Sequence, residues 1–249
     1  MAPNAVVSIF QVPVSEHWSL DTGHWFPPMP KIELMRRVLA GNDALAAAQR
    51  KELDRHGVLG INIMSGPGAG KTSLVERTAE ALSRKYRMQV IEGDIQGDLD
   101  ARRVAAKGVR CIQINTQGAC HLDGLMLGPA MGDIDLANLD LLLIENVGNL
   151  VCPAEFALPV HYNVTVISTP EGSDKPVKYP LMFSKSDILI INKIDLLPFV
   201  DFDVPALKKA VRKLRPGITF VEMSAKTGEG VEKWVAWLEQ KLRGRRKKQ

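Results

Sequence analysis

Apolar and polar positions alternate along the chain in blocks that predict strands and helices in turn. Short apolar runs predict strands at 58–64, 88–92, 109–114, 139–145, 163–168, 187–191 and 218–223. Between these runs, apolar residues recur every three or four positions, which predicts helices at 71–85, 98–107, 121–131, 176–184, 204–214 and 229–242. This alternation is typical of a mostly parallel sheet with right-handed crossovers and helices on both faces. We therefore expect an α/β fold whose ligand loops gather at the carboxyl ends of the strands.

The region before the first strand has a different pattern. Residues 1–30 contain several prolines and little periodicity, so they predict an irregular arm. Residues 31–40 suit a first helix. Asn42 can then cap a second helix that runs over 43–55, just before Gly57. The folded part of the chain is therefore expected to begin with two helices.

Charge and cysteine content narrow the functional classes. Five of the 32 basic residues lie in the last seven positions, so 243–249 is expected to be a disordered basic tail after a domain at 31–242. The other 27 basic residues face 28 acidic ones, and this balance predicts no broad basic face for nucleic acid. No apolar run reaches the roughly 18 residues of a membrane-spanning helix, and no signal peptide is evident. Three cysteines without a secretory signal favour the reducing cytoplasm.

The loop after the first predicted strand carries the sequence SGPGAGKT at 65–72. Strand, glycine-rich loop and helix form a phosphate cradle, because glycines let backbone N–H groups turn inward and the helix N-terminus adds positive charge. The usual pattern has glycine where this chain has Ser65. The expected contacts come from Gly66, Gly68, Ala69, Gly70, Lys71, Thr72 and Ser73. Within this set, Lys71 is expected to reach the β- and γ-phosphates and Thr72 to bind Mg²⁺, as in a P-loop NTPase.

Two later motifs indicate which base is bound. Asn192, Lys193 and Asp195 directly follow an apolar strand. A carboxylate at this place accepts both guanine donors, N1–H and the 2-amino group, whereas ATP would leave it poorly paired. The last predicted strand is followed by a motif that is placed to offer backbone N–H to the base carbonyl, made of Ser224, Ala225 and Lys226. The order of these motifs predicts a protein that binds GTP and GDP.

Two loops carry candidate ligands for a transition metal. Cys120 and His121 follow the strand at 109–114, and Cys152 follows the strand at 139–145. Two thiolates and one imidazole suit Zn²⁺ or Ni²⁺ and leave one coordination position open. The alternative is that both cysteines are small buried hydrophobes, and spacing alone does not decide between the two. We expect the two strands to flank the phosphate-binding strand, so that the metal would lie near the γ-phosphate.

Four blocks of sequence resemble the HypB family. They start at Ile91, Gly118, Ile144 and Glu171 and read IEGDIQ, GACHLD, IENVGNLVCP and EGSDKP. HypB proteins are GTPases that assist nickel insertion into nickel–iron hydrogenase. The resemblance implies a GTP-dependent homodimer, with the hydrogenase large subunit and a second metallochaperone as partners.

The resemblance also implies residue roles. Mg²⁺ or its bound water would be held by Thr72, Asp94 and Glu145, and hydrolysis would be served by Lys71, Asp94 and Glu145. The nickel or zinc ion would be held by Cys120, His121 and Cys152. Many family members carry a cysteine-rich or histidine-rich nickel site before the G domain. Residues 1–50 contain no cysteine and two histidines, so such a site is not expected here.

The leading hypothesis is therefore a metallochaperone GTPase in which catalysis is mainly positioning and charge neutralisation. The alternative is a GTP-dependent interaction chaperone of a related class, without metal transfer, in which the cysteines and histidine are incidental. A partition-type ATPase is disfavoured, because that class carries a second lysine early in the loop, where this chain has Gly66.

Overall fold

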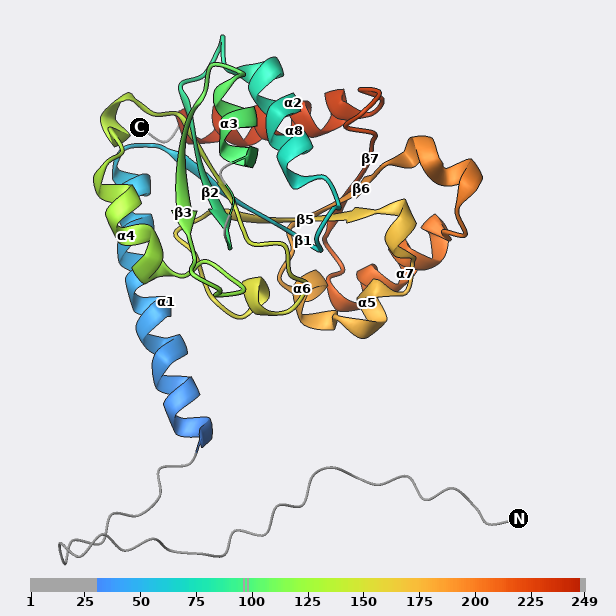
Figure 1. Ribbon diagram of the computed structural model, residues 1–249, viewed down its shortest axis with the longest axis horizontal. Coiled ribbons are helices and arrows are strands. Elements are labelled where there is room, and N and C mark those ends of the chain that lie inside the picture. Colours follow the sequence, from blue (N-terminus) through green and yellow to red (C-terminus); the bar gives the residue numbers. More distant parts are fainter. Residues whose placement is uncertain (1–30, 96, 98, 247–249) are drawn as a thin grey trace, which may run out of the picture.

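The computed structural model describes residues 31–95, 97 and 99–246, so the arm at 1–30 and the last three tail residues lie outside it. Within this part, seven parallel strands form one sheet in the order β3-β2-β4-β1-β5-β6-β7 (Figure 1). The strands are β1 (Leu59–Ser65), β2 (Met88–Asp94), β3 (Arg110–Asn115), β4 (Leu141–Glu145), β5 (Tyr162–Ser168), β6 (Ile188–Asn192) and β7 (Thr219–Glu222). The predicted α/β fold is confirmed.

Helices cover both faces of this sheet (Figure 1). They are α1 (Lys31–Arg55), α2 (Lys71–Leu82), α3 (Leu99–Ala105), α4 (Gly124–Gly132), α5 (Lys175–Lys178), α6 (Pro180–Ser184), α7 (Val204–Leu214) and α8 (Val231–Arg246). Short 3₁₀ turns occur at Leu136–Asn138, Cys152–Ala154, Thr169–Glu171 and Ile194–Phe199. None of the described helices is long and apolar enough to cross a membrane.

Burial on two faces explains the continuous apolar strands. In β4, Leu141 and Leu143 pack in a cluster with α2 and α8, whereas Leu142 and Ile144 pack in a second cluster with α1 and α4. A third cluster joins α6 and α7 to β5 and β6. In the first cluster Trp234 of α8 is fully buried, and its indole N–H is satisfied by Thr78 of α2 at 2.8 Å.

The predicted pair of N-terminal helices is wrong in one respect, because α1 is a single helix that continues through Gly41. Asn42 does not cap a helix. Its side chain accepts a hydrogen bond from Gly124 N at 2.8 Å and donates one to Ala157 O at 2.9 Å. These contacts fix the inner half of α1 to the domain. The outer half projects away from it (Figure 1), and Met35 and Val38 there are about half exposed.

Other helix boundaries differ for local reasons. The helix expected at 121–131 begins only at Gly124, because Asp123 caps it by accepting from Met126 N at 2.8 Å. The helix expected at 176–184 is split into α5 and α6 at Pro180, which lacks the N–H that a continuous helix needs. The prediction of a disordered tail at 243–249 is wrong for the first four of these residues, which continue α8 as far as Arg246.

The prediction that the strands leading to Cys120 and Cys152 both lie beside β1 is only half right. β4, which leads to Cys152, does lie beside β1. β3, which leads to Cys120, is instead the edge strand, with β2 and β4 between it and β1. The chain moves outward from β1 through β2 to β3 and then returns to insert β4 beside β1.

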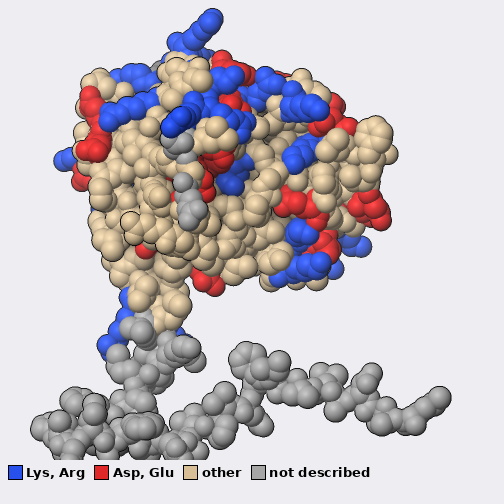
Figure 2. Space-filling model, viewed as in Figure 1, with Lys and Arg blue, Asp and Glu red and all other residues tan. Residues whose placement is uncertain are grey.

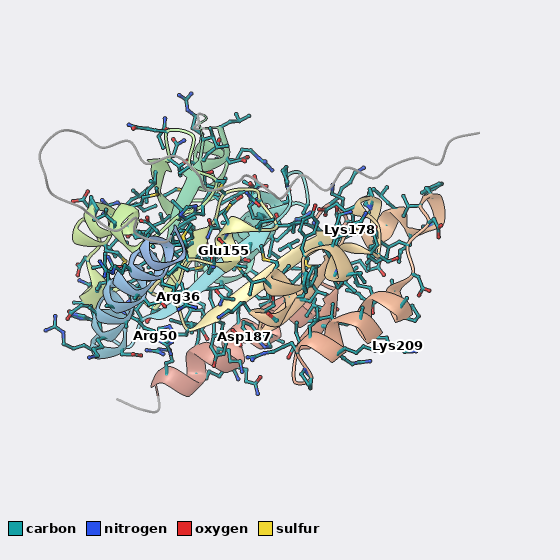
Figure 3. All side chains as sticks on the ribbon, turned by 90° about the horizontal axis from the view of Figure 1, so that it is seen from below. Arg36, Arg50, Glu155, Lys178, Asp187 and Lys209 are labelled. Carbon is teal, nitrogen blue, oxygen red and sulfur yellow. The ribbon has the colours of Figure 1, made fainter. Side chains whose placement is uncertain are left out.

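The surface carries charges of both signs. In Figure 2, basic and acidic side chains are interspersed over the upper part of the visible face. Seen from below in Figure 3, Arg36 and Arg50 mark α1 at one end of the molecule, while Lys178 of α5 and Lys209 of α7 lie at the other end.

A buried histidine just before β5 joins β1, α1 and α8 at the amino edge of the sheet. His161 Nδ1 accepts from Gly60 N at 2.9 Å, so its proton lies on Nε2, which donates to Asp54 at 3.0 Å. Arg245 of α8 also donates to Asp54. Burial, reinforced by the positive charge of Arg245, lowers the pKa of His161 to about 4.

This histidine predicts a stability loss in mild acid. An unfolded histidine has a pKa of about 6.5, so between about pH 6.5 and pH 4 the unfolded chain binds the extra proton and the folded chain does not. Lowering the pH from about 7.5 to 5 therefore removes about 2 kcal/mol of His161's contribution to the free energy of unfolding, so the wild type should lose about 2 kcal/mol relative to His161→Asn over this range. Urea unfolding at both pH values measures the loss. His161→Asn keeps an acceptor near Gly60 N but cannot titrate, so equal pH dependence in both proteins would contradict this account.

Candidate functional site

The predicted phosphate loop connects β1 to α2 at the carboxyl edge of the sheet. Gly68 and Gly70 have positive φ angles of 72° and 100°, a region that favours glycine. A Cβ at Gly70 would lie 2.4 Å from Asn192 Nδ2, so a larger residue could not occupy this position. The local backbone thus fits the cradle that the sequence predicted.

Two side chains at the start of α2 are held by partners from the sheet. Lys71 Nζ donates to Ser65 Oγ at 3.2 Å, so the residue that departs from the usual glycine holds the lysine at the loop. Thr72 Oγ1 donates to Glu145 Oε1 at 2.8 Å, and both residues are buried. The structure therefore brings together Thr72 and Glu145, two of the three predicted Mg²⁺ residues.

A second buried carboxyl group, which the sequence analysis missed, lies beside Glu145. Glu92 of β2 pairs in register with Glu145 of β4, and each has an Oε2 atom without a hydrogen-bond partner among the described residues. Burial and the charge of Glu145 raise the pKa of Glu92 to about 8, and burial raises that of Glu145 to about 7. An acidic residue inside an otherwise apolar strand was the available signal. Two desolvated carboxyl groups with unused oxygen atoms suit a bound cation.

Asp94, the third predicted Mg²⁺ residue, lies at the end of β2, two positions after Glu92. Its carboxylate accepts hydrogen bonds from Ile95 N at 2.6 Å and Gly97 N at 3.1 Å. In this arrangement the side chain closes its own loop, and among the described residues it makes no hydrogen bond to Thr72 or Glu145. A Mg²⁺ contact by Asp94 stays a prediction.

Asn192 joins the three predicted nucleotide motifs. Its Nδ2 donates to Ala69 O in the phosphate loop at 2.8 Å, and its Oδ1 accepts from Ala225 N at 3.0 Å. Lys193 Nζ donates to Gly68 O at 2.7 Å. Segments more than 100 positions apart in the chain therefore meet at one place.

A cavity of about 660 Å³ lies beside these motifs. The predicted residues that line it are Gly70, Ser73, Asn192, Lys193, Asp195, Ala225 and Lys226. Asp195 Oδ1 has no partner among the described residues, as expected of an acceptor whose donors come from a ligand. Ser224 is buried and accepts from Thr227 N at 3.1 Å, which shapes the turn that presents Ala225.

Arg77 is a further residue at this cavity that the sequence analysis missed. It lies on α2 and donates from Nε to Ala225 O at 2.7 Å and from Nη2 to Lys226 O at 2.9 Å. These two bonds fix the loop of the third motif against the helix of the first. No local pattern marks this residue, because its contacts span more than 140 positions and go to backbone oxygen atoms.

The candidate metal ligands come together as predicted. One ligand atom from each of Cys120, His121 and Cys152 lies within 4.8 Å of the others. Cys120 Sγ is 3.8 Å from His121 Nδ1, and Asn149 Nδ2 lies 3.5 Å from Cys152 Sγ. Cys120 and His121 are adjacent residues that share the site because they lie in a bend before α4 rather than in a strand or helix.

The surroundings of this cluster favour neutral ligand forms. The imidazole of His121 stacks on Phe156 with ring centroids 3.7 Å apart, and burial lowers the pKa of His121. The hydrogen bond with Cys120, together with burial, raises the pKa of Cys152 to about 11. The third cysteine, Cys111, is partly buried and packs against the core from β3.

Comparisons with known proteins point to one family. The CobW/HypB/UreG nucleotide-binding domain matches residues 60–222. Hydrogenase maturation factor HypB of Azotobacter vinelandii is 46% identical over 208 residues, which are 84% of this chain and 69% of that protein. The crystal structure of HypB from Helicobacter pylori in complex with nickel has a TM-score of 0.78 and 38% identity, covering 82% of this chain and 96% of that one. HypB from Archaeoglobus fulgidus has a TM-score of 0.77 and 38% identity, covering 82% and 100%.

The family resemblance carried by the four sequence blocks is thereby confirmed. The matched domain at 60–222 includes the phosphate loop, the motif at 192–195 and both candidate metal loops, and the Azotobacter vinelandii protein matches 84% of the chain. The chain belongs to the HypB branch of the CobW/HypB/UreG family of nucleotide-binding proteins.

Proposed function

We propose that the protein is a GTP-hydrolysing metallochaperone that assists nickel insertion during the maturation of nickel–iron hydrogenase. The observation that carries the proposal is the cluster of Cys120, His121 and Cys152, whose ligand atoms lie within 4.8 Å of one another in a chain of the HypB family. Two sulfur atoms and one nitrogen atom form a donor set that binds Ni²⁺ or Zn²⁺. An incidental pair of core cysteines would not need a histidine beside them.

The nucleotide site supports GTP as the ligand. Asp195 lines the cavity, and its buried Oδ1 has no partner among the described residues, which suits a carboxylate that accepts the two donors on the guanine edge. The backbone of the phosphate loop and Lys71 are placed to hold the phosphates. The unpartnered oxygen atoms of Glu92 and Glu145 fit a cation, and Mg²⁺ bound there would neutralise charge on the phosphate groups.

Hydrolysis then depends on groups that this chain holds in place. Lys71 offers a positive charge to the β- and γ-phosphate oxygens, where negative charge develops during phosphoryl transfer. Thr72 is aligned by its hydrogen bond to Glu145. Asp94, on the loop after β2, is proposed to contact Mg²⁺ or its bound water once its loop rearranges around the nucleotide.

The metal is the cargo in this proposal. His121 has a lowered pKa, so its imidazole is neutral and able to bind a metal at neutral pH. The raised pKa of Cys152 means that metal binding must displace a thiol proton, so the affinity should rise with pH.

We further propose that GTP closes two copies of the chain into a dimer. Its other proposed partners are a second metallochaperone and the hydrogenase large subunit. We place it in the cytoplasm as part of this proposal, since reducing conditions there keep cysteines free.

Asp195→Asn tests the base assignment. The amide replaces one acceptor oxygen by a donor, which opposes the donor edge of guanine but suits xanthine. We expect GTP affinity to fall by about 30-fold, or about 2 kcal/mol, and XTP affinity to rise. Competition with a fluorescent nucleotide measures both. Asp203→Asn, which changes a helix-capping aspartate away from the cavity, serves as the control. GTP affinity equal to that of the wild type would refute guanine recognition by Asp195.

The metal content of the purified protein tests the proposed function itself. We expect one tightly bound nickel or zinc ion per chain, with an affinity that differs between GDP and a non-hydrolysable GTP analogue. Protein that binds GTP but takes up neither metal would instead be a GTP-dependent interaction chaperone without metal transfer.

A further inference from the structure

Asn146 lies between the proposed nucleotide site and the proposed metal site. It directly follows Glu145 at the end of β4, and it is fully buried. Its Oδ1 accepts two backbone hydrogen bonds, from Leu122 N at 3.0 Å and from Val147 N at 2.9 Å. Leu122 directly follows His121. One side chain therefore links the neighbour of a phosphate-site carboxylate to the neighbour of a metal ligand.

Leu122 has a second attachment, to β2. Its side chain is fully buried and rests on Gly93, where an added Cβ would lie 2.7 Å from it. Gly93 lies between Glu92 and Asp94, so Leu122 touches both strands that carry the carboxylates of the nucleotide site. Protein interiors are close-packed, so a shift of either strand end displaces Leu122 instead of being absorbed by empty space.

The other side of the Asn146 amide is also fixed. Asn146 Nδ2 donates to Asn62 Oδ1 at 3.2 Å, and Asn62 Nδ2 donates to Asn163 Oδ1 at 3.0 Å. This row of amides crosses from the end of β4 through β1 to β5. A buried polar row adds little net stability compared with an apolar one, but it allows only one orientation of its members. The bond to Asn62 therefore sets the direction in which Asn146 Oδ1 points.

We propose that Asn146 is the positioning residue that couples the metal loop to the nucleotide site. A change at Glu145 on nucleotide exchange moves Asn146, Asn146 moves the Leu122 amide, and the displacement reaches His121 and Cys120 in the same loop. This role rests on the proposed function, since it requires a metal affinity that depends on the nucleotide. Asn146 touches neither the nucleotide nor the metal, so its effect should appear in the coupling between the two.

The test is a titration of the full chain with Ni²⁺ alone, in the presence of GDP or a non-hydrolysable GTP analogue. In the wild type we expect the two nickel affinities to differ by about 5- to 150-fold, the usual range for linked sites. In Asn146→Ala this difference should fall below about twofold, because the backbone N–H of Leu122 has lost its acceptor. The nickel affinity without nucleotide should fall by roughly tenfold, as for loss of a group that orients a ligand.

Asn163→Ala is the matched control. It removes a side-chain amide from the far end of the same row, away from Leu122, and should retain the wild-type difference. If Asn146→Ala does not fold, Asn146→Ser provides the same test with a smaller polar group. The unmodified chain offers another readout: without nickel, the Leu122 amide resonance should shift between the two nucleotide states.

The possible failures are distinguishable. If Asn146→Ala retains the full difference in nickel affinity between the two nucleotide states, the role of Asn146 is overturned and the proposed function is left intact. A Leu122 resonance that is the same in both nucleotide states would have the same consequence. Equal nickel affinities in both nucleotide states of the wild type would overturn the proposed coupling and the role of Asn146 with it. Loss of the difference in Asn163→Ala as well would reduce Asn146 to one structural member of the row.

Discussion

Lys71→Ala is expected to slow GTP hydrolysis by roughly 100-fold or more, because the transition state loses a positive charge placed against the transferring phosphoryl group. The structure already holds this ammonium group at the loop through Ser65 Oγ at 3.2 Å. The backbone of Gly148 also lies close to this ammonium group, since a Cβ at Gly148 would lie 3.5 Å from Lys71 Nζ. A substituted side chain or a water molecule cannot supply the same charge there. Single-turnover hydrolysis at saturating GTP measures the loss in the chemical step.

Lys85→Ala is the control for this variant. Lys85 follows the same helix, α2, but pairs with Glu239 at the far end of it, so its removal should leave hydrolysis unchanged. Metal binding without nucleotide should survive in Lys71→Ala, since the three metal ligands lie on other loops. Hydrolysis within twofold of the wild-type rate would remove Lys71 from the mechanism.

Cys152→Ala is expected to weaken nickel or zinc binding by roughly 100-fold or more. Binding free energies of structural zinc sites are about 10–16 kcal/mol, so one ligand contributes about 3 kcal/mol. The loss should be selective, because Cys152 lies on the turn after β4 and not in the nucleotide cavity. Competition with a chelator gives the metal affinity, and a GDP titration should show nucleotide affinity close to that of the wild type.

Cys111→Ala is the control that distinguishes loss of a proposed metal ligand from loss of any thiol. Cys111 packs against the core from β3, and burial raises the pKa of its thiol to about 12, so removing it should not change metal affinity. The wild-type affinity should also decrease as the pH falls, because binding displaces thiol protons, and Cys152→Ala should reduce this pH dependence. If Cys152→Ala and Cys111→Ala bind metal equally well, the proposed cluster is not the site.

Local patterns were sufficient to predict the strands, although not which strands lie side by side. Each predicted strand appears within about two residues of its expected position, because strands buried on both faces leave long apolar runs. Gly41 and Asn42 misled the prediction for α1, since both residue types favour helix ends. Tertiary contacts determine the role of Asn42 instead: its side chain forms hydrogen bonds with Gly124 and Ala157, more than 80 positions away.

The same difference between local patterns and tertiary contacts explains which site residues could be predicted from the sequence. Lys71, Asp195 and Cys152 lie in short motifs whose chemistry is legible from neighbouring residues. Arg77 and Asn146 act through backbone atoms of distant segments, and any residue type can provide a backbone amide or carbonyl group. No sequence pattern marks such partners, so they appear only in the folded structure.

The projecting half of α1 divides this chain into parts that unfold separately. Its described side chains are largely exposed up to Gly41, and an isolated helical segment of this length is marginal in water. Glycine inside a helix costs about 1 kcal/mol relative to alanine and weakens the junction further. The inner half, anchored by Ala46 and Leu53, melts with the sheet, while the outer half frays on its own. A global unfolding free energy therefore reports the nucleotide-binding domain and should hardly change on substitution of the exposed side chains at 35–38.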